Sequence, residues 1–225
     1  MNNPPASSLK KNIHITGAST GIGFGAAGAF ARAGYIVIAT VRSKPDAGRL
    51  VEQLSPDVHP VLCDVTNPEQ VAALPARVRE LTGNEQLDGL INNAGIVAGP
   101  GPVEFQKMAD IRAQFEVNVF GLMAVTMALL PLLGTKPDSK NHAGRIINIS
   151  SVGGLIASPY IAAYAATKHA VEAFHTVCGG SCGFLASRSS SSGRAPSNLK
   201  SGTRAGALPP IHSKARPMKI RLPGS

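Results

Sequence analysis

The regular alternation of short apolar runs with helix-like segments is the feature that most restricts the fold of this 225-residue chain. Strand-like runs occupy residues 12–16, 35–39, 59–62, 87–91 and 145–149. Helical patterns occupy residues 22–33, 46–54, 68–81 and 109–133, and a further helix begins near residue 161. Strands that alternate with helices predict βαβ units, in which helices cover both faces of a parallel sheet. The expected fold class is therefore α/β: a Rossmann-like, doubly wound parallel sheet in a three-layer αβα arrangement.

Charge is distributed unevenly along the chain, which has 22 Lys and Arg, 13 Asp and Glu, and a formal net charge of +9. Residues 1–175 contain all of the acids and have a net charge of +1, whereas residues 176–225 contain no acid and have a net charge of +8. The second segment is rich in Ser, Gly and Pro and has no sustained periodicity. Such a segment buries too little apolar surface to offset its ordering entropy. We therefore predict an N-terminal extension at 1–11, a Rossmann-like domain at 12–175 and a disordered basic tail at 176–225.

A glycine-rich turn, TGASTGIG at residues 16–23, connects the first predicted strand to the first predicted helix. Glycine allows a sharp turn and a close approach of the backbone to a pyrophosphate, and a helix N-terminus favours the anion. Gly17, Gly21 and Gly23 are spaced G-x3-G-x-G, and such a turn alone also fits an ordinary strand-to-helix connection. Its position after the first strand favours a dinucleotide site.

Arg42 follows the second predicted strand, where an Asp or Glu would accept hydrogen bonds from an adenosine ribose and favour NAD. An arginine there can instead pair with the 2′-phosphate of NADP in a charge-assisted fork. The alternative is a solvated surface arginine. Together with the glycine-rich turn, Arg42 favours NADP(H) over NAD(H).

Tyr164 and Lys168 are four residues apart at the start of a predicted helix, so they share one helix face. A phenol with a pKa of about 10 is a poor base at neutral pH, but a neighbouring ammonium lowers that pKa. Ser151 lies at the carboxyl end of the fifth predicted strand, where ligands bind in such sheets, and its hydroxyl can donate to a substrate carbonyl. Taken singly, these residues also fit a helix surface pair and a strand-end turn.

Together these features resemble the short-chain dehydrogenase/reductase superfamily over about residues 12–175. The matching segments stand in order at compatible spacings: TGASTGIG at 16–23, Asp64-Val65, Asn92-Asn93-Ala94-Gly95, Asn118, Ile149-Ser150-Ser151 and Tyr164-Ala165-Ala166-Thr167-Lys168. The resemblance implies hydride transfer between NAD(P)H and a carbonyl or alcohol, with a small molecule as substrate.

The resemblance also implies roles for individual residues. Tyr164 is the acid/base, Ser151 positions the carbonyl oxygen, and Asn118 supports a water in the proton relay. Lys168 lowers the tyrosine pKa and holds the nicotinamide ribose. Ser150 is less favoured than Ser151, because adjacent strand side chains face opposite ways. The implied cofactor-binding residues are Gly17, Ser19, Thr20, Gly21, Ile22 and Gly23 in the phosphate loop, Arg42, Asp64 and Val65 at the adenosine end, Asn92, Ala94 and Gly95 in the turn beside it, and Tyr164 and Lys168.

Other candidate features carry less weight. The six histidines do not cluster as metal ligands, and Cys178 and Cys182 lack a second pair, so no metal site is predicted. The longest apolar run, residues 122–133, is too short for a membrane span, and the first residues contain no signal-peptide stretch. The expectation is a cytoplasmic protein without a membrane partner. In the resembled family, the long helix at Ala109–Leu133 often lies at a dimer interface, which implies a possible homo-oligomer.

The resemblance stops after residue 174, where the family adds a sixth strand, a Pro-Gly turn, a substrate-covering segment and a seventh strand. A frameshift explains this if Ser189–Ser192 use TCN codons, because the shifted frame encodes four apolar residues and permits a Pro-Gly turn soon after. The alternative is a natural splice or lineage-specific tail, and codons 174–205 of the coding DNA decide between them. Loss of the sixth strand exposes the fifth as an edge. We therefore predict a sheet incomplete at its C-terminal edge and an aggregation-prone chain with weak or no turnover.

Three functions remain open at this point. The favoured one is an NADP(H)-dependent oxidoreductase of carbonyl or alcohol substrates, and the second is a catalytically impaired nucleotide-binding remnant of such an enzyme. In the third, the basic tail binds nucleic acid. Phe184 is the only aromatic residue after residue 175, so the tail lacks the aromatic side chains that stack on bases. We therefore predict no specific nucleic-acid partner.

Overall fold

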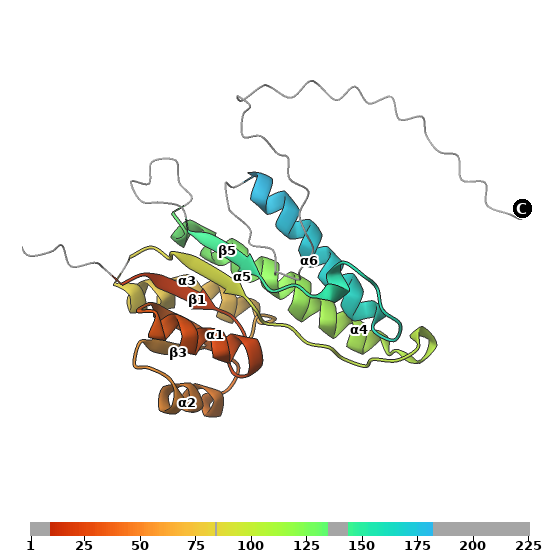
Figure 1. The fold of residues 1–225 in the computed structure, drawn as a ribbon, viewed down its shortest axis with the longest axis horizontal. Helices are drawn as coiled ribbons and strands as arrows, with labels where there is room; N and C mark the ends of the chain where they lie inside the picture. Colours follow the sequence, from red (N-terminus) through yellow and green to blue (C-terminus); the bar gives the residue numbers. More distant parts are fainter. Residues whose placement is uncertain (1–9, 84, 135–143, 182–225) are drawn as a thin grey trace, which may run out of the picture. The chain divides into compact units, whose positions relative to one another are not determined.

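A computed structural model describes residues 10–83, 85–134 and 144–181, and the statements below concern these ranges (Figure 1). The predictions made for residues 182–225, including those for Cys182 and Phe184, lie outside the described residues.

Five strands form one parallel sheet, in the order β3-β2-β1-β4-β5. The strands are β1 (Asn12–Ile15), β2 (Ile36–Val41), β3 (Val58–Leu62), β4 (Gly89–Asn92) and β5 (Arg145–Asn148). The chain begins in the middle of the sheet, proceeds outward to β3 and then crosses to β4 on the other side of β1. This reversal makes the carboxyl ends of β1 and β4 the topological switch point, where open α/β sheets bind ligands. The predicted fold class is confirmed.

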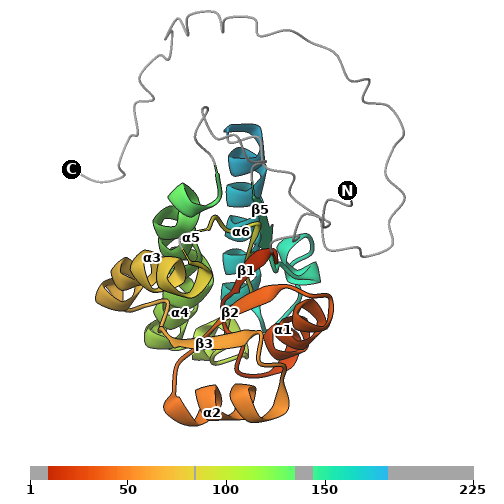
Figure 2. The same cartoon turned by 90° about the vertical axis from the view of Figure 1, so that its left-hand side faces the viewer.

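Helices cover both faces of this sheet (Figure 2). They are α1 (Gly21–Arg32), α2 (Lys44–Gln53), α3 (Pro68–Thr82), α4 (Met108–Phe115), α5 (Leu122–Leu129) and α6 (Ala162–Ser181). On one face, Ile13 and Ile15 pack with residues of α1 and α2. On the other face, Ile38 and Leu90 pack with residues of α3 and α5. Because successive strand side chains point to opposite faces, β2, β3, β4 and β5 contribute to both apolar clusters, whereas the apolar residues of β1 belong to the first alone.

Local signals determine where several helices begin and end. The Asn67 side chain accepts from Gln70 N at 3.0 Å and caps α3, as predicted. Gly34, with φ of +85°, follows the end of α1 as predicted. Helix α2 begins at Lys44, two residues before the predicted start, because Ser43 accepts from Asp46 N at 3.2 Å and Pro45 fits the first turn.

The long helix predicted at 109–133 is observed as one helical stretch from Met108 to Leu132. Its middle is a π-helical segment, η2 (Glu116–Gly121), which the sequence patterns do not predict. By length and composition alone, the stretch is long and apolar enough to cross a membrane. Core helices of soluble proteins pass the same test, and Val125 and Leu129 are fully buried here.

The C-terminal part of the described fold differs from the sequence prediction in one respect. Helix α6 runs to Ser181, so the boundary predicted after His175 falls inside a helix. Thr176 Oγ1 donates to Glu172 O at 2.9 Å, one turn earlier in the same helix. Within the described residues, β5 pairs with β4 alone and forms an edge of the sheet, as predicted.

Candidate functional site

The glycine-rich turn between β1 and α1 adopts a conformation that side chains oppose. Gly17 and Gly21 have φ values of +64° and +58°, in the left-handed region that favours glycine. A Cβ on Gly17 would lie 2.8 Å from Ala94 Cα, and one on Gly23 would collide with Gly17 O and Asn93 Nδ2. Glycine is therefore required at Gly17 and Gly23 for the turn to pack against the segment that follows β4.

Hydrogen bonds join this turn to the segment after β4. Thr16 Oγ1 accepts from Asn93 N at 2.9 Å and from Ala94 N at 3.0 Å. The Asn93 side chain donates in return to Thr16 O at 3.0 Å and Gly17 O at 2.9 Å. These bonds bridge the switch point and hold the two loops in one arrangement. Asn93 and Thr16 are not among the site residues predicted from the sequence; the strand-end position of Asn93 beside Asn92 is the signal that could have identified it.

The side chain of Asn92, which the sequence predicts to contact the cofactor, instead bonds to α5 and β5. Its Nδ2 donates to Thr126 Oγ1 at 2.8 Å and Asn148 Oδ1 at 2.9 Å, so the buried amide ties β4 to α5 and β5. The alternation of strand side chains explains why Asn92 and Asn93 serve different neighbours.

A cavity of about 360 Å³ opens at the switch point. The predicted cofactor-binding residues that line it are Gly17, Ser19, Thr20, Ile22, Arg42, Asp64, Val65, Ala94, Gly95, Tyr164 and Lys168. Gly21, Gly23 and Asn92 are not among its lining residues. The tertiary structure therefore brings together groups from β1, β2, β3, β4 and α6 that are widely separated in the sequence.

At the end of the cavity formed by β2 and β3, one cation is unpaired. Arg42 is exposed and makes no ion pair or hydrogen bond with any part of the chain that the structure describes. Asp64 Oδ1 accepts from Thr66 N at 2.9 Å and from Thr66 Oγ1 at 2.8 Å, which fixes the carboxylate. Burial, and then the Asp64 charge, raise the pKa of the adjacent Cys63 thiol to about 11. The cavity thus offers a free guanidinium and an unreactive thiol at this end.

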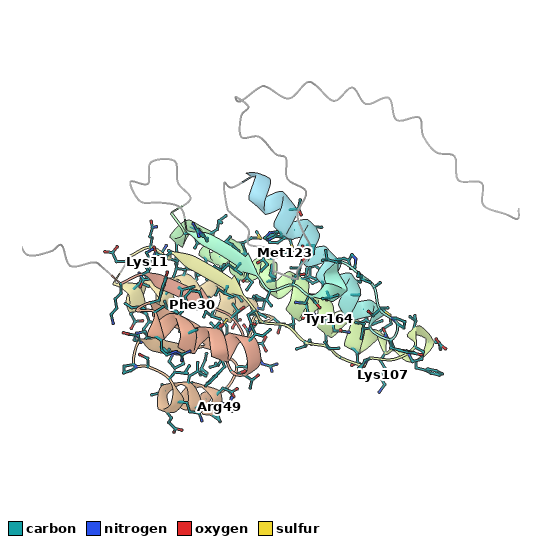
Figure 3. All side chains as sticks on the ribbon, viewed as in Figure 1. Lys11, Phe30, Arg49, Lys107, Met123 and Tyr164 are labelled. Carbon is teal, nitrogen blue, oxygen red and sulfur yellow. The ribbon has the colours of Figure 1, made fainter. Side chains whose placement is uncertain are left out.

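At the other end, Tyr164 and Lys168 meet on one face of α6, as their spacing predicts. Lys168 Nζ lies 5.7 Å from the centroid of the Tyr164 ring and donates to Ile149 O at 2.8 Å. Burial lowers the pKa of Lys168 from its ordinary value, and the Glu172 carboxylate opposes that shift. The bond to Ile149 fixes the Lys168 ammonium between the end of β5 and the phenol (Figure 3 labels Tyr164 near the start of α6).

Ser151 and Ser150 differ in their surroundings. Ser151 Oγ accepts from Gly153 N at 3.1 Å and caps the 3-10 helix η4 (Val152–Gly154). A Cβ on Gly153 would lie 3.4 Å from Tyr164 Cε1 and 3.5 Å from Ser151 Oγ, so the hydroxyl and the ring flank the same glycine. Ser150 borders the cavity, but its Oγ is buried and has no partner among the described residues. Ser151 does not line the cavity, and its role stays a prediction.

Asn118, in the π-helical segment, uses its side chain to connect three parts of the fold. Its Oδ1 accepts from Ile96 N at 2.7 Å, and its Nδ2 donates to Ile96 O at 2.9 Å and to Thr167 Oγ1 at 3.1 Å. Thr167 Oγ1 donates to Tyr164 O at 2.7 Å. Asn118 therefore helps to position the helix that presents Tyr164. Its role in a proton relay stays a prediction.

Within the three described ranges, no group of three or more His, Cys, Asp or Glu side chains lies close enough to hold a metal ion. The chemistry available at the cavity is thus that of a phosphate-binding turn, a free guanidinium and a phenol beside an ammonium. Together with the doubly wound sheet, these features define a nucleotide-binding α/β protein.

A model of the short chain dehydrogenase family matches residues 11–180, and the chain belongs to this family. It is 41% identical over 165 residues to dehydrogenase/reductase SDR family member 9 from Bos taurus, covering 73% of this chain and 50% of that protein. It is 36% identical over 161 residues to NADPH-dependent 3-dehydrocapnine reductase from Ornithobacterium rhinotracheale, covering 72% and 56%. A short chain dehydrogenase/reductase from Burkholderia phymatum, solved in complex with NAD, is similar with a TM-score of 0.67 and 32% identity, covering 75% and 58%. The chain spans about half the length of the relatives it matches.

Proposed function

We propose that this chain is an NADP(H)-dependent oxidoreductase that interconverts a carbonyl and an alcohol by hydride transfer. The observation that carries the proposal is one cavity that joins the glycine turn, the unpaired Arg42 and the Tyr164–Lys168 pair. Each feature alone has an ordinary explanation, but their meeting at the switch point matches the requirements of a bound dinucleotide and a proton donor.

The residues present fit NADP(H). The backbone at Gly17 and Ser19, beside the N-terminus of α1, suits the pyrophosphate. The unpaired Arg42 guanidinium suits a 2′-phosphate, and it has no competing carboxylate within contact distance among the described residues. The name of the 3-dehydrocapnine reductase supports NADPH, whereas the Burkholderia phymatum protein binds NAD. The bound cofactor supplies or accepts the hydride.

The protein residues manage the proton. In the direction of reduction, Tyr164 Oη donates its proton to the substrate oxygen as the carbonyl carbon receives the hydride. The Lys168 ammonium, held by Ile149 O, stabilises the phenolate that this leaves. Ser151 donates a hydrogen bond to the same substrate oxygen. In the direction of oxidation, the phenolate accepts the alcohol proton.

Loss of the Tyr164 hydroxyl tests this proposal directly. NADPH oxidation by the purified 225-residue chain is measured against a panel of aldehydes and ketones, for the wild type, Tyr164→Phe and Tyr35→Phe. Tyr164→Phe should lower kcat by about 10²–10⁴-fold, the usual contribution of a positioned acid, and retain NADPH binding. Tyr35 is the matched control, because it does not line the cavity and its ring packs on Phe30. Equal loss of activity in both variants would contradict the assigned role.

The surface beside Tyr164 supports an apolar substrate. Exposed large apolar side chains gather in two segments near the cavity, at Val97, Val103, Phe105 and Met108 and at Val152, Leu155, Ile156 and Tyr160. Gly101 N donates to Tyr160 O at 2.7 Å, which joins the two segments. We propose that the carbonyl carries an apolar group that lies on this surface. KM should then fall as the alkyl chain of a straight-chain aldehyde is lengthened, and an unchanged KM would argue against this.

A second candidate function is cofactor binding without turnover, as in the impaired remnant weighed above. The observation that favours it is the edge position of β5, which carries Ile149 and Ser151 at its end. NADPH binding measured by titration of its fluorescence, together with absent turnover on the carbonyl panel, would establish this alternative over the first.

The assembly and location of the protein are also proposed. Phe120 and Met127 are 54% and 68% exposed on the long helix, which supports a homo-oligomer formed through this helix. The proposed location is the cytoplasm. Light scattering of Met127→Lys against the wild type tests the interface, and fractionation of cells tests the location. A monomeric wild type would exclude the oligomer.

A further inference from the structure

An ion pair on α2 contacts the phosphate-binding turn. Arg49 Nη2 lies 2.6 Å from Asp46 Oδ1 and also donates to Ser19 O at 2.8 Å. Ser19 lines the cavity, whereas Arg49 and Asp46 do not (Figure 3 labels Arg49 on α2). One guanidinium nitrogen therefore joins the start of α2 to the turn that holds the pyrophosphate in the proposed function.

The second oxygen of Asp46 connects the pair to the residue next to Arg42. Ser43 Oγ donates to Asp46 Oδ2 at 2.7 Å, and Ser43 also caps α2. The Asp46 carboxylate is therefore held beside the segment that carries the unpaired Arg42. A 2′-phosphate of NADP(H) bound by Arg42 would be repelled by this carboxylate unless a cation compensates the Asp46 charge.

Arg49 supplies that compensation. The Arg49 and Asp46 side chains are 39% and 27% exposed, so salt partly screens their charges, and the guanidinium at 2.6 Å offsets the charge of the carboxylate. We propose that Arg49 is a positioning residue that sets cofactor selectivity: it neutralises Asp46 and anchors Ser19, so that the cavity accepts a 2′-phosphate beside Arg42. This inference rests on the NADP(H) preference in the proposed function.

The test compares two ligands that differ only in the 2′-phosphate and require no turnover. Titration calorimetry measures binding of 2′-phospho-ADP-ribose and of ADP-ribose to the wild type, Arg49→Gln, Arg49→Lys, Asp46→Asn/Arg49→Gln and Arg77→Gln. Arg77 also pairs with an acid three residues away, Glu80 on α3, although in the reverse order along the helix, and it does not line the cavity, so Arg77→Gln is the control. Thermal unfolding confirms that each variant is folded.

Arg49→Gln should weaken 2′-phospho-ADP-ribose roughly tenfold more than ADP-ribose at low salt, because it exposes the Asp46 charge. Asp46→Asn/Arg49→Gln should restore most of this discrimination, and Arg49→Lys should retain it, because both keep the site free of an uncompensated carboxylate. High salt should reduce the extra loss of affinity that Arg49→Gln causes for 2′-phospho-ADP-ribose. Arg77→Gln should change the affinity of neither ligand.

Two outcomes would overturn the inference and leave the proposed function intact. In the first, the wild type prefers 2′-phospho-ADP-ribose and Arg49→Gln weakens both ligands equally or neither, so that Arg49 only supports the loop. In the second, the double variant fails to regain discrimination. A wild type that prefers ADP-ribose would instead contradict the proposed NADP(H) preference, and the inference would fall with it.

Discussion

The two sides of the cavity are built on different principles. On the cofactor side, Thr16 and Asn93 exchange hydrogen bonds across the switch point, and glycines in the left-handed region allow the loops to touch. On the side proposed to bind the substrate, the segments at 97–108 and 152–160 present exposed apolar side chains, joined by the bond from Gly101 N to Tyr160 O. Binding of a charged ligand requires polar groups that are already held in position, whereas binding of an apolar group requires only an apolar surface that it can cover. Cofactor binding and turnover should therefore respond to different substitutions.

The largest expected effect concerns His14, in the strand that carries the cofactor turn. His14 is fully buried between Ile38 and Leu90 of the flanking strands, and neither ring nitrogen has a partner among the described residues. Burial lowers its pKa from 6.5 to about 3. Since the folded state resists protonation, stability should be full above pH 6.5 and should fall as the pH drops from 6.5 towards 3, by up to about 5 kcal/mol.

Urea unfolding of His14→Val at a series of pH values checks this expectation. The variant should lose most of the pH dependence in that window and be as stable as the wild type or more so at pH 7, because an unpaired imidazole leaves the core. His169→Gln, at an exposed position of α6, is the control and should keep the wild-type slope. An unchanged slope in His14→Val would show that other groups cause the acid sensitivity.

The second largest effect is expected for Gly17→Ala, which should disrupt the glycine turn on the cofactor side of the cavity. A Cβ there would press on Ala94 Cα at 2.8 Å in a backbone with φ of +64°, so we expect a loss of about 2–3 kcal/mol in unfolding free energy and at least tenfold weaker NADPH binding. Gly48→Ala is the matched control, because Gly48 lies inside α2 with nothing near its Cβ position. It should stabilise the protein by up to about 1 kcal/mol. Comparable NADPH affinity in the two variants would be inconsistent with a tight turn.

Asn93→Ala sharpens the comparison with a smaller effect. It removes the two side-chain bonds to Thr16 O and Gly17 O and keeps the backbone bonds to Thr16 Oγ1, so the cofactor turn is held less firmly. NADPH should bind roughly tenfold more weakly, equivalent to about 1.4 kcal/mol. KM for the carbonyl substrate should change little. Asn67→Ala removes the side-chain cap of α3 at a residue that does not line the cavity, and it should cost about 1 kcal/mol of stability without altering NADPH affinity.

Phe105→Ser should have the smallest effect on the fold. Phe105 is 77% exposed, so stability should change by less than about 0.5 kcal/mol and NADPH affinity should be unaffected. If the apolar surface binds substrate, KM for a long-chain aldehyde should rise while KM for a short one stays constant. A uniform rise for both would remove the reason to assign this surface to an apolar group.

Much of the fold follows from local patterns. Alternating strand and helix segments predict the sheet and its layers, and Asn67, Pro68 and Gly34 mark helix ends through short-range bonds and backbone preferences. The spacing of Tyr164 and Lys168 predicts their shared face, since helix geometry is itself local. The π-helical segment at Glu116–Gly121 has no such signal. It is stabilised by contacts of Asn118 with Ile96 and Thr167, which are distant in the sequence.

The sequence by itself determined the succession of strands and helices along the chain, the position of the glycine turn, and the residue types that can bind phosphate and move a proton. Only the tertiary structure decided that Asn93 faces the turn while Asn92 faces α5, and that Arg49 reaches both Asp46 and Ser19. The physical reason is the distance along the sequence over which each interaction acts. Backbone propensity and helix periodicity act over a few residues, whereas the direction of a side chain and the partner of a charge depend on segments that only folding brings together.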